Sequence, residues 1–286
     1  MPNIKLSQPA TLDEAVSLLA KDGDQTKIIA GGTALVIMLR NHLISPSALL
    51  SLGHLQNLHY IRHEPVTGLR IGGLVTIREA ETSPLVRDKQ PTLALTFGKV
   101  GNVRVRNAAT VGGNLSEADY ASDPPCALVA LRARVKASSV RGEREISLTE
   151  FFKGFYETAL SPDEILTELI VPDLAPGTRS AYLKYVSRSS EDRPCVGVAV
   201  VLENEADGTC KDLRLVAGAV SETPQEFAGA AMARGKHLTD SLIEEIAGSF
   251  SSDVEPLSDL RGSAWYRKQI IRVMARRAIQ QASSAH

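Results

Sequence analysis

The sequence Lys27-Ile28-Ile29-Ala30-Gly31-Gly32-Thr33-Ala34-Leu35 joins a short apolar run directly to a glycine pair. The apolar run predicts a buried strand, and the residues from Thr33 to about Arg40 predict a helix. A glycine pair lets backbone N–H groups approach a ligand closely, because no Cβ atom stands in the way. A helix that begins just after the pair adds the positive end of its dipole. The stretch therefore predicts a strand, a turn and a helix suited to holding a phosphate group.

A second glycine pair follows further along the chain, in Thr110-Val111-Gly112-Gly113-Asn114. Three side chains in the two segments could donate hydrogen bonds to phosphate oxygens: Thr33, Thr110 and Asn114. Two such segments could bracket one pyrophosphate. The alternative for each pair alone is a tight turn in a sheet. Neither segment fits G-x-G-x-x-G or the P-loop pattern, so a Rossmann or nucleotide-hydrolase site is not supported.

The pattern of elements predicts an α+β protein with a boundary after Pro172. The clearest linker is Leu174-Ala175-Pro176-Gly177-Thr178, because it is short and rich in turn residues. Upstream, a helix that Thr11 begins is expected between two strands in a βαβ-like start. Downstream, the expected strands are 181–187, 195–203 and 211–220, and the expected helices lie near 224–233, 239–249 and 263–282.

Composition excludes several classes of protein. The chain has 286 residues, of which 43% are apolar and 23% charged, as in ordinary globular proteins. Its 32 basic and 33 acidic residues give a net charge of −1, which argues against a general nucleic-acid or membrane-surface binder. The apolar stretches are far shorter than the roughly 20 residues of a membrane span. The first residues lack an apolar signal core, so a cytoplasmic location is expected.

The distribution of cysteine and histidine argues against metal centres and hydrolase chemistry. The three cysteines are Cys126, Cys195 and Cys210, and they form no C-x-x-C pair and no Cys/His cluster with metal-ligand spacing. We therefore expect no intrinsic iron–sulfur cluster and no structural zinc. The sequence also lacks G-x-S-x-G and any nucleophile motif paired with histidine.

Three further features have both a binding and a structural interpretation. Asp123 could accept hydrogen bonds from ribose or ribityl hydroxyls, or it could cap the helix that follows Pro124-Pro125. Lys184 lies in an alternating strand, where it could neutralise a ligand's charge or face solvent. The final helix, 263–282, carries many arginines beside an apolar face. It could dock on its own domain with a solvated basic side, or contact a partner subunit.

The segments occur in the order found in a known family. Besides the two glycine segments, the family pattern has a V-R-N lead-in and an S-D-x-P, which correspond here to Val105-Arg106-Asn107 and Ser122-Asp123-Pro124-Pro125. Later pieces are Gly154-Phe155-Tyr156-Glu157-Thr158 and the closing helix. Over nearly its whole length, the sequence resembles the medium, FAD-binding subunit of the xanthine dehydrogenase and carbon monoxide dehydrogenase family of molybdenum hydroxylases.

The resemblance implies a fold and a set of FAD contacts. It implies a two-lobed, PCMH-type FAD-binding domain over residues 1–175, with the lobes split near residue 55. A smaller α+β domain of the CO dehydrogenase flavoprotein C-terminal type would follow over 178–282. It implies no catalytic or metal-binding residue on this chain. The implied FAD contacts are Ile29, Ala30, Gly31, Gly32, Thr33, Ala34, Leu35, Val100, Ala109, Thr110, Gly113, Asn114, Asp123, Leu166 and Lys184.

Two of these contacts have a specific implied role, and one position departs from the family pattern. Asp123 would bind the polyol of FAD, and Lys184 would lie near the flavin ring or the ribityl chain. Ala34 stands where relatives often carry a polar residue, so backbone donors would have to suffice there.

The resemblance also implies a role in electron transfer. FAD on this chain would collect electrons from [2Fe–2S] clusters on a small subunit, after substrate oxidation at the molybdenum cofactor of a large subunit, and pass them to an external acceptor. The family suggests a dimer of such heterotrimers. One alternative is a self-sufficient FAD oxidoreductase with its own substrate site. A second alternative is a scaffold subunit that has lost FAD.

Overall fold

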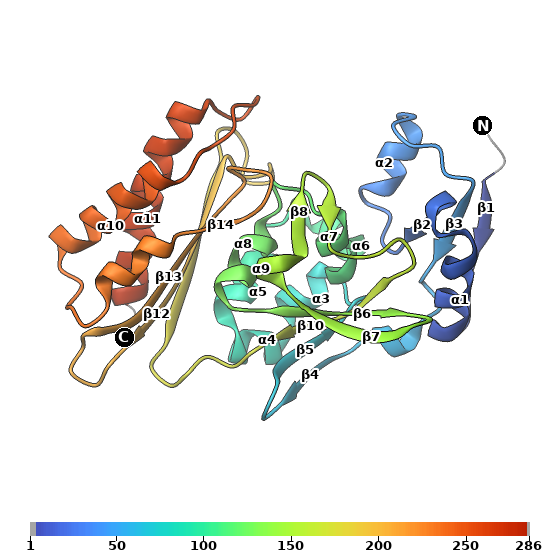
Figure 1. Ribbon diagram of the computed structural model, residues 1–286, viewed down its shortest axis with the longest axis horizontal. Helices are drawn as coiled ribbons and strands as arrows, with labels where there is room; N and C mark the ends of the chain where they lie inside the picture. Colours follow the sequence, from blue (N-terminus) through green and yellow to red (C-terminus); the bar gives the residue numbers. More distant parts are fainter. Residues whose placement is uncertain (1–3, 285–286) are drawn as a thin grey trace.

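The computed structural model describes residues 4–284, and it has three parts in chain order along its long axis (Figure 1). The N-terminal lobe contains β1 (Lys5–Ser7), α1 (Leu12–Asp22), a 3₁₀ turn (Gly23–Gln25), β2 (Thr26–Ile29), α2 (Leu35–Arg40) and β3 (Ala48–Ser51). Its three strands form a parallel sheet in the order β1-β3-β2. The Thr11 side chain caps α1 by accepting from the N–H of Glu14. Helix α1 packs its apolar side against β3 and the residues after it.

The middle part is built on a five-stranded antiparallel sheet in the order β4-β5-β10-β6-β7. Its strands are β4 (Ile61–Glu64), β5 (Gly68–Gly72), β6 (Arg134–Ser139), β7 (Gly142–Ser147) and β10 (Ile165–Val171); a 3₁₀ turn (Gln56–Leu58) precedes them, and a small hairpin joins β8 (Phe152–Gly154) and β9 (Glu157–Thr158). Its helices are α3 (Ile77–Thr82), α4 (Pro84–Lys89), α5 (Pro91–Phe97), α6 (Val103–Ala108), α7 (Val111–Glu117), α8 (Asp123–Ala130) and α9 (Leu148–Phe151).

The C-terminal part is a four-stranded antiparallel sheet with two long helices. The elements are β11 (Arg179–Tyr185), β12 (Val196–Asn204), β13 (Cys210–Gly218), β14 (Gln225–Glu226), a 3₁₀ helix (Ala228–Ala233), α10 (Asp240–Asp253) and α11 (Ala264–Ser284). Alternate residues of this sheet enter two different cores. Tyr182 and Ala199 pack with α8 in the core of the middle part, whereas Ala181 and Val198 pack with α10 and α11. The sheet therefore separates the middle part from the two C-terminal helices.

Several elements differ from the sequence-based expectation. The helix expected near 224–233 is a two-residue strand followed by a 3₁₀ helix. The helix expected from Thr33 begins at Leu35.

The final helix docks on its own domain, which was one of the two alternatives. Its apolar side packs against β11 and β12. Its basic side is not simply solvated, however, since Arg267 is fully buried and donates to Asp259 Oδ1 at 2.6 Å. Arg272 and Arg276 pair with Glu244 of α10. No helix within residues 4–284 is both long enough and apolar enough to cross a membrane.

Candidate cofactor-binding site

The first glycine segment, residues 30–35, is an open loop between β2 and α2. Gly32 has φ +68°, a left-handed conformation that glycine adopts without strain. No residue among 4–284 accepts a hydrogen bond from the backbone N–H groups of residues 31 to 35. A run of unpaired backbone donors is a typical anion-binding arrangement, because orphan N–H groups need an acceptor. The loop therefore offers main-chain donors to a ligand.

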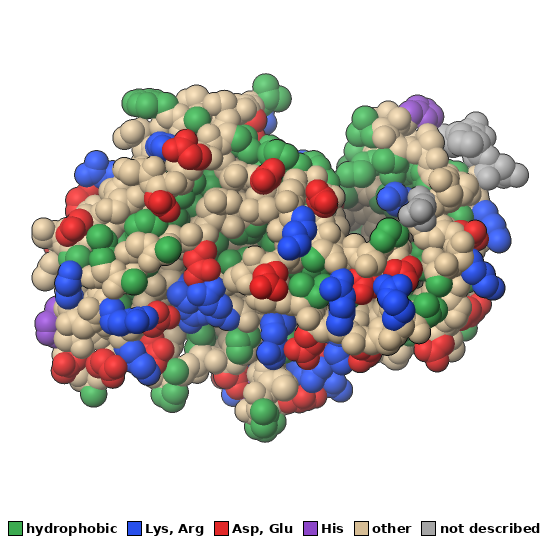
Figure 2. All heavy atoms as spheres, viewed as in Figure 1, with side chains coloured by type: hydrophobic (Ala, Val, Ile, Leu, Met, Phe, Trp, Pro, Cys, Tyr) green, Lys and Arg blue, Asp and Glu red, His purple; other side chains and the backbone are tan. Residues whose placement is uncertain are grey.

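Gly31 brings this loop directly against the second segment. A Cβ atom on Gly31 would overlap the carbonyl oxygen of Ala108, at the end of α6. Ala108 lies just before Ala109 and Thr110, which lead into α7. The two glycine segments, far apart in sequence, are thus neighbours in space. Figure 2 shows the surface hollowed between the N-terminal lobe and the middle part, beside these elements.

The second glycine pair lies inside a helix, which corrects the expected turn. Thr110 is the N-cap of α7, and its hydroxyl accepts from the N–H of Gly113 at 3.0 Å. The N–H groups of Val111 and Gly112 donate to the carbonyls of Val75 and Gly73, both at 2.9 Å. These carbonyls satisfy N–H groups of the first turn, which have no acceptor within the helix. The first turn of α7 therefore contributes its dipole and its shape, and its N–H groups already have partners.

The two glycines of α7 face opposite ways. A Cβ atom on Gly112 would lie 2.8 Å from the carbonyl oxygen of Gly73, so this residue allows the helix to pack on the backbone of the middle part. Gly113 is exposed, and a Cβ atom there would meet only the Thr110 hydroxyl, at 2.8 Å. A ligand can therefore approach α7 closely at Gly113.

Asn114 connects α7 to the start of α8. Its Nδ2 donates to Ser122 Oγ at 2.9 Å, and Ser122 Oγ lies 3.1 Å from its Oδ1. Ser122 occupies the N-cap position of α8, but its side chain accepts no hydrogen bond from the helix. Asp123 is the first helical residue. The carboxylate of Asp123 accepts from residues of β11 instead. Capping of α8 is therefore not the role of Asp123.

Asp123 and Lys184 form one buried polar cluster between α8 and β11. Lys184 Nζ lies 3.0 Å from Asp123 Oδ2, and Tyr182 donates to Asp123 Oδ1 at 2.8 Å. Lys184 also donates to the carbonyl of Lys99 at 2.7 Å. Burial raises the pKa of Asp123 to about 6, against the opposing effects of Lys184 and Tyr182. The lysine side chain is only 5% exposed, so the solvent-facing alternative is wrong.

The remaining predicted contacts line the same region. Ile29 lies directly under the loop, with its side chain 3.4 Å from a Cβ position on Gly32. Leu166 is buried on β10, and its carbonyl approaches Gly73, which packs against Gly112 of α7. Val100 is half-buried in the turn between α5 and α6. The structure thus places Leu166 behind α7 and Val100 on the side of the Lys184 cluster.

The sequence analysis missed the apolar surface of α2. This helix has no buried residue, and the side chains of Val36 and Ile37 are 43% and 58% exposed. The signal was present, since Leu35-Val36-Ile37-Met38-Leu39 is apolar on every side of a helix. An uncovered apolar helix beside open amides suits a ligand with both a charged and an apolar portion.

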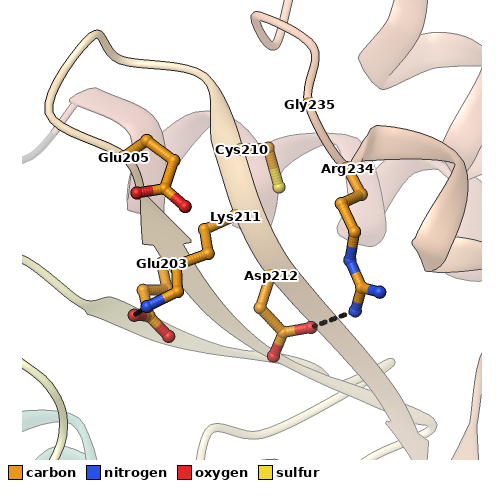
Figure 3. A pocket seen from close by; sticks show the side chains of 7 residues that line it. All are labelled: Glu203, Glu205, Cys210, Lys211, Asp212, Arg234 and Gly235. Carbon is orange, nitrogen blue, oxygen red and sulfur yellow. Dashed lines mark hydrogen bonds and ion pairs between the residues drawn. The ribbon is translucent and has the colours of Figure 1, made fainter.

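A separate hollow of about 430 Å³ lies on the C-terminal sheet, away from both glycine segments (Figure 3). Its lining residues are Glu203, Glu205, Cys210, Lys211, Asp212, Arg234 and Gly235. Lys211 pairs with Glu203 and Arg234 with Asp212, while burial raises the pKa of the Cys210 thiol to about 11. Both cations of the hollow are paired with its carboxylates, and the thiol is held neutral. Its residues therefore do not form a second candidate site.

Two family models match the chain. The FAD-binding domain of molybdopterin dehydrogenases matches residues 2–174, and the C-terminal domain of CO dehydrogenase flavoproteins matches residues 181–282. The chain belongs to the FAD-binding medium subunits of the molybdenum hydroxylase family. The resemblance drawn from the motifs is confirmed, as is the order of the two domains. These medium subunits are components of oxidoreductases.

Full-length relatives and solved structures agree with this family. The chain is 32% identical to the glyceraldehyde dehydrogenase medium chain of Sulfolobus acidocaldarius, over 98% of both chains. It is 30% identical to the carbon monoxide dehydrogenase medium chain of Hydrogenophaga pseudoflava, over 98% of this chain and 97% of the other. A structure of carbon monoxide dehydrogenase from H. pseudoflava, lacking the Mo-pyranopterin moiety, matches 98% of this chain with TM-score 0.93 and 31% identity, covering 97% of its own chain.

The medium-subunit fold holds residues that fit FAD. The pyrophosphate of FAD needs hydrogen-bond donors, which the open amides of residues 31–35 supply. Close approach to α7 is possible at Gly113, where a Cβ atom would otherwise project. The exposed apolar side chains of α2 suit an aromatic ring system. Backbone donors, open space and apolar surface therefore coincide at one place.

Proposed function

We propose that this chain is the FAD-carrying electron-transfer subunit of a molybdenum hydroxylase. It would take electrons from [2Fe–2S] clusters on a partner subunit and pass them to an external acceptor. The observation that carries the proposal is the loop at residues 31–35, whose amides have no partner among residues 4–284 and which packs through Gly31 against the end of α6, just before α7. This arrangement is a cradle for a pyrophosphate, which is the invariant part of an FAD site.

We propose that FAD is held by three groups of residues. The loop and the end of β2 supply the donors to one side of the pyrophosphate, and the α7 segment supplies the other side. Val100, Leu166, Asp123 and Lys184 complete the site. The full set is Ile29, Ala30, Gly31, Gly32, Thr33, Ala34, Leu35, Val100, Ala109, Thr110, Gly113, Asn114, Asp123, Leu166 and Lys184.

The Asp123 cluster would hold the polyol side of the cofactor. Tyr182 and Lys184 fix the carboxylate from β11, so Asp123 can accept from a hydroxyl without moving. When bound, FAD supplies a carrier that accepts electrons singly and holds two of them. The protein's part is to position the cofactor and to set the charge around it; no acid–base triad is required.

The partners follow from the type of subunit. Relatives carry the names medium chain and FAD-binding subunit, which supports a large molybdenum-cofactor subunit and a small [2Fe–2S] subunit as companions, in a dimer of heterotrimers. Relatives with 32% or 33% identity are named for glyceraldehyde, nicotine and nicotinate. Because similar medium subunits occur in enzymes named for such different substrates, a partner subunit would determine which substrate is oxidised. A domain division into 1–175 and 178–282 and a cytoplasmic location are part of this proposal.

The test is to isolate the native complex through this chain and to analyse its cofactors. We expect an oxidised-flavin absorbance band near roughly 450 nm, FAD on extraction, and co-purifying chains that carry molybdenum and [2Fe–2S] iron. A yellow chain that oxidises a substrate unaided would instead establish a self-sufficient flavoenzyme. A colourless chain that ignores added FAD would overturn the cofactor assignment.

A further inference from the structure

The turn between α5 and α6, residues 98–102, is fixed by two cations from outside it. Arg106 Nη1 donates to the carbonyls of Val100 and Gly101, both at 3.0 Å. Lys184 Nζ donates to the carbonyl of Lys99 at 2.7 Å. Three successive carbonyls therefore accept hydrogen bonds from charged side chains, which are among the strongest that a protein makes. Although the turn has no regular secondary structure, the bonds from Arg106 and Lys184 fix its backbone.

Arg106 is itself fixed by α3. Its Nε donates to Glu81 Oε2 at 2.8 Å, and its side chain is only 13% exposed. Glu81 also pairs with Arg78 at 3.0 Å. The guanidinium thus joins three elements, namely α3, the turn and α6. The planar guanidinium has donors in fixed directions, so it can satisfy these acceptors together.

Arg106 also controls where the two glycine segments meet. It lies in α6, two residues before Ala108, whose carbonyl packs on Gly31. The same helix leads directly to Thr110, the cap of α7. A shift of α6 would therefore move the turn that carries Val100, the contact under the amide loop, and the start of α7. All three belong to the proposed FAD site.

We propose that Arg106 is a positioning residue for FAD. By bonding the carbonyls of Val100 and Gly101 to Glu81, it holds α6 so that the loop at 31–35 and the first turn of α7 keep the spacing that one pyrophosphate requires. This role rests on the proposed function, because it presupposes that FAD binds between these segments. It explains why the V-R-N lead-in precedes the second glycine segment in this sequence.

The test compares Arg106→Gln with Arg104→Gln in the full-length chain, purified with its companion subunits and freed of FAD. Arg104 lies on the same helix, is exposed, and makes no ion pair among the described residues. Glutamine at 106 removes the bonds to the turn, while Arg78 remains beside Glu81. We expect the FAD dissociation constant to rise about tenfold or more for Arg106→Gln, because the turn loses its charge-assisted bonds, and to stay unchanged for Arg104→Gln.

Two further readouts separate positioning from general support. The visible circular dichroism of bound FAD should change in Arg106→Gln, and the rise in Tm that FAD produces should shrink. Arg106→Lys keeps the charge but loses the planar fork, so its affinity should lie between those of the wild type and Arg106→Gln. An unaltered dissociation constant and dichroism in Arg106→Gln, with only a lower Tm, would overturn the proposal. If Arg106→Gln does not fold, wild-type affinity in Arg106→Lys would overturn it.

Gly32→Val, measured in the same series, separates this proposal from the proposed function. If Gly32→Val loses FAD while Arg106→Gln keeps it, the role of Arg106 is wrong and the FAD site stands. If Gly32→Val binds FAD as the wild type does, the location of the site is wrong, and the positioning role falls with it.

Discussion

The two glycine pairs of this molecule look alike in sequence and work differently in the structure. The pair at 31–32 lies in an open loop whose amides have no partner among residues 4–284, whereas the amides around the pair at 112–113 are bonded within the protein. In each pair one glycine faces inward against backbone, Gly31 on Ala108 and Gly112 on Gly73. In the proposed site, the first pair would therefore supply donors, and the second would supply shape and a helix dipole.

The inward glycine of the first pair should be the most sensitive position. Gly31→Ala would force a Cβ atom into the carbonyl oxygen of Ala108, so the two segments must separate. Overpacking against backbone costs roughly 3 kcal/mol or more, and we expect no detectable FAD. The measurement is FAD content and Tm of the purified protein. Gly248→Ala on α10, where a Cβ atom meets nothing within 4 Å, is the matched control. Normal FAD content in Gly31→Ala would show that the segments need not touch.

The outward glycines should differ in the size of their effect. Gly32→Val strains the backbone at φ +68° and crowds Val36 and Ile29, which lie 3.2 and 3.4 Å from the new Cβ atom, so the loop must shift and we expect FAD affinity to fall about a hundredfold. Gly113→Val keeps helical backbone, blocks the approach to α7 and crowds the Thr110 hydroxyl, which would lie 2.8 Å from the new Cβ atom, so a loss of about tenfold is expected. Both dissociation constants can be measured by flavin fluorescence titration. Equal losses of FAD affinity in the two variants would contradict the view that the first pair supplies donors and the second supplies shape.

Two carboxylates lie near the second glycine pair, and comparing them tests whether Asp123 is the one that contacts the polyol of FAD. Asp123→Asn should weaken FAD about tenfold, because it removes the partner of Lys184 and an acceptor for the polyol. Glu117→Gln, on α7, should have a smaller effect, although burial raises the pKa of Glu117 to about 7. The two variants are compared by the same titration. A larger loss for Glu117→Gln would move the polyol contact away from Asp123.

Asp123 also predicts a pH dependence of stability. Its pKa rises to about 6 on folding, so the folded state binds the extra proton between the ordinary carboxyl pKa and about 6. The contribution of Asp123 to the free energy of unfolding is therefore full below that window and is lost as the pH rises through it. Asp123→Asn should remove this component. Urea unfolding from pH 4.5 to 7 measures it, and parallel pH profiles for wild type and variant would contradict it.

The smallest expected effect concerns the cap of the second pair. Thr110→Ala removes the acceptor for the Gly113 N–H and should cost about 1 kcal/mol of stability. Because the donors to the ligand lie in the other segment, FAD affinity should fall by less than about tenfold. Thermal unfolding and FAD titration together measure the two effects. Complete loss of FAD in Thr110→Ala would mean that the α7 segment also binds FAD directly.

The local parts of this architecture were predictable, and the contacts between distant segments were not. The strand expected at 181–187 is confirmed as β11, and the strand expected before Gly31 is confirmed as β2. Local sequence could not show that Gly73 and Val75 would supply acceptors that draw Gly112 into a helix. For the same reason, neither alternative for the final helix anticipated that Arg267 is buried against Asp259. Each difference arises from a partner that lies far away in the chain.

The C-terminal sheet has a consequence for exchanging parts between related proteins. One face of this sheet completes the core around α8, and Lys184 on that face neutralises Asp123 of the other domain. A chimera joined within residues 172–178 would therefore inherit half of a buried ion pair and half of an apolar contact from each parent. Such recombinants should fold only when both parents carry matching residues on the two sides. The chain passes from one sheet to the next at the linker, but the two domains cannot be exchanged there independently of each other.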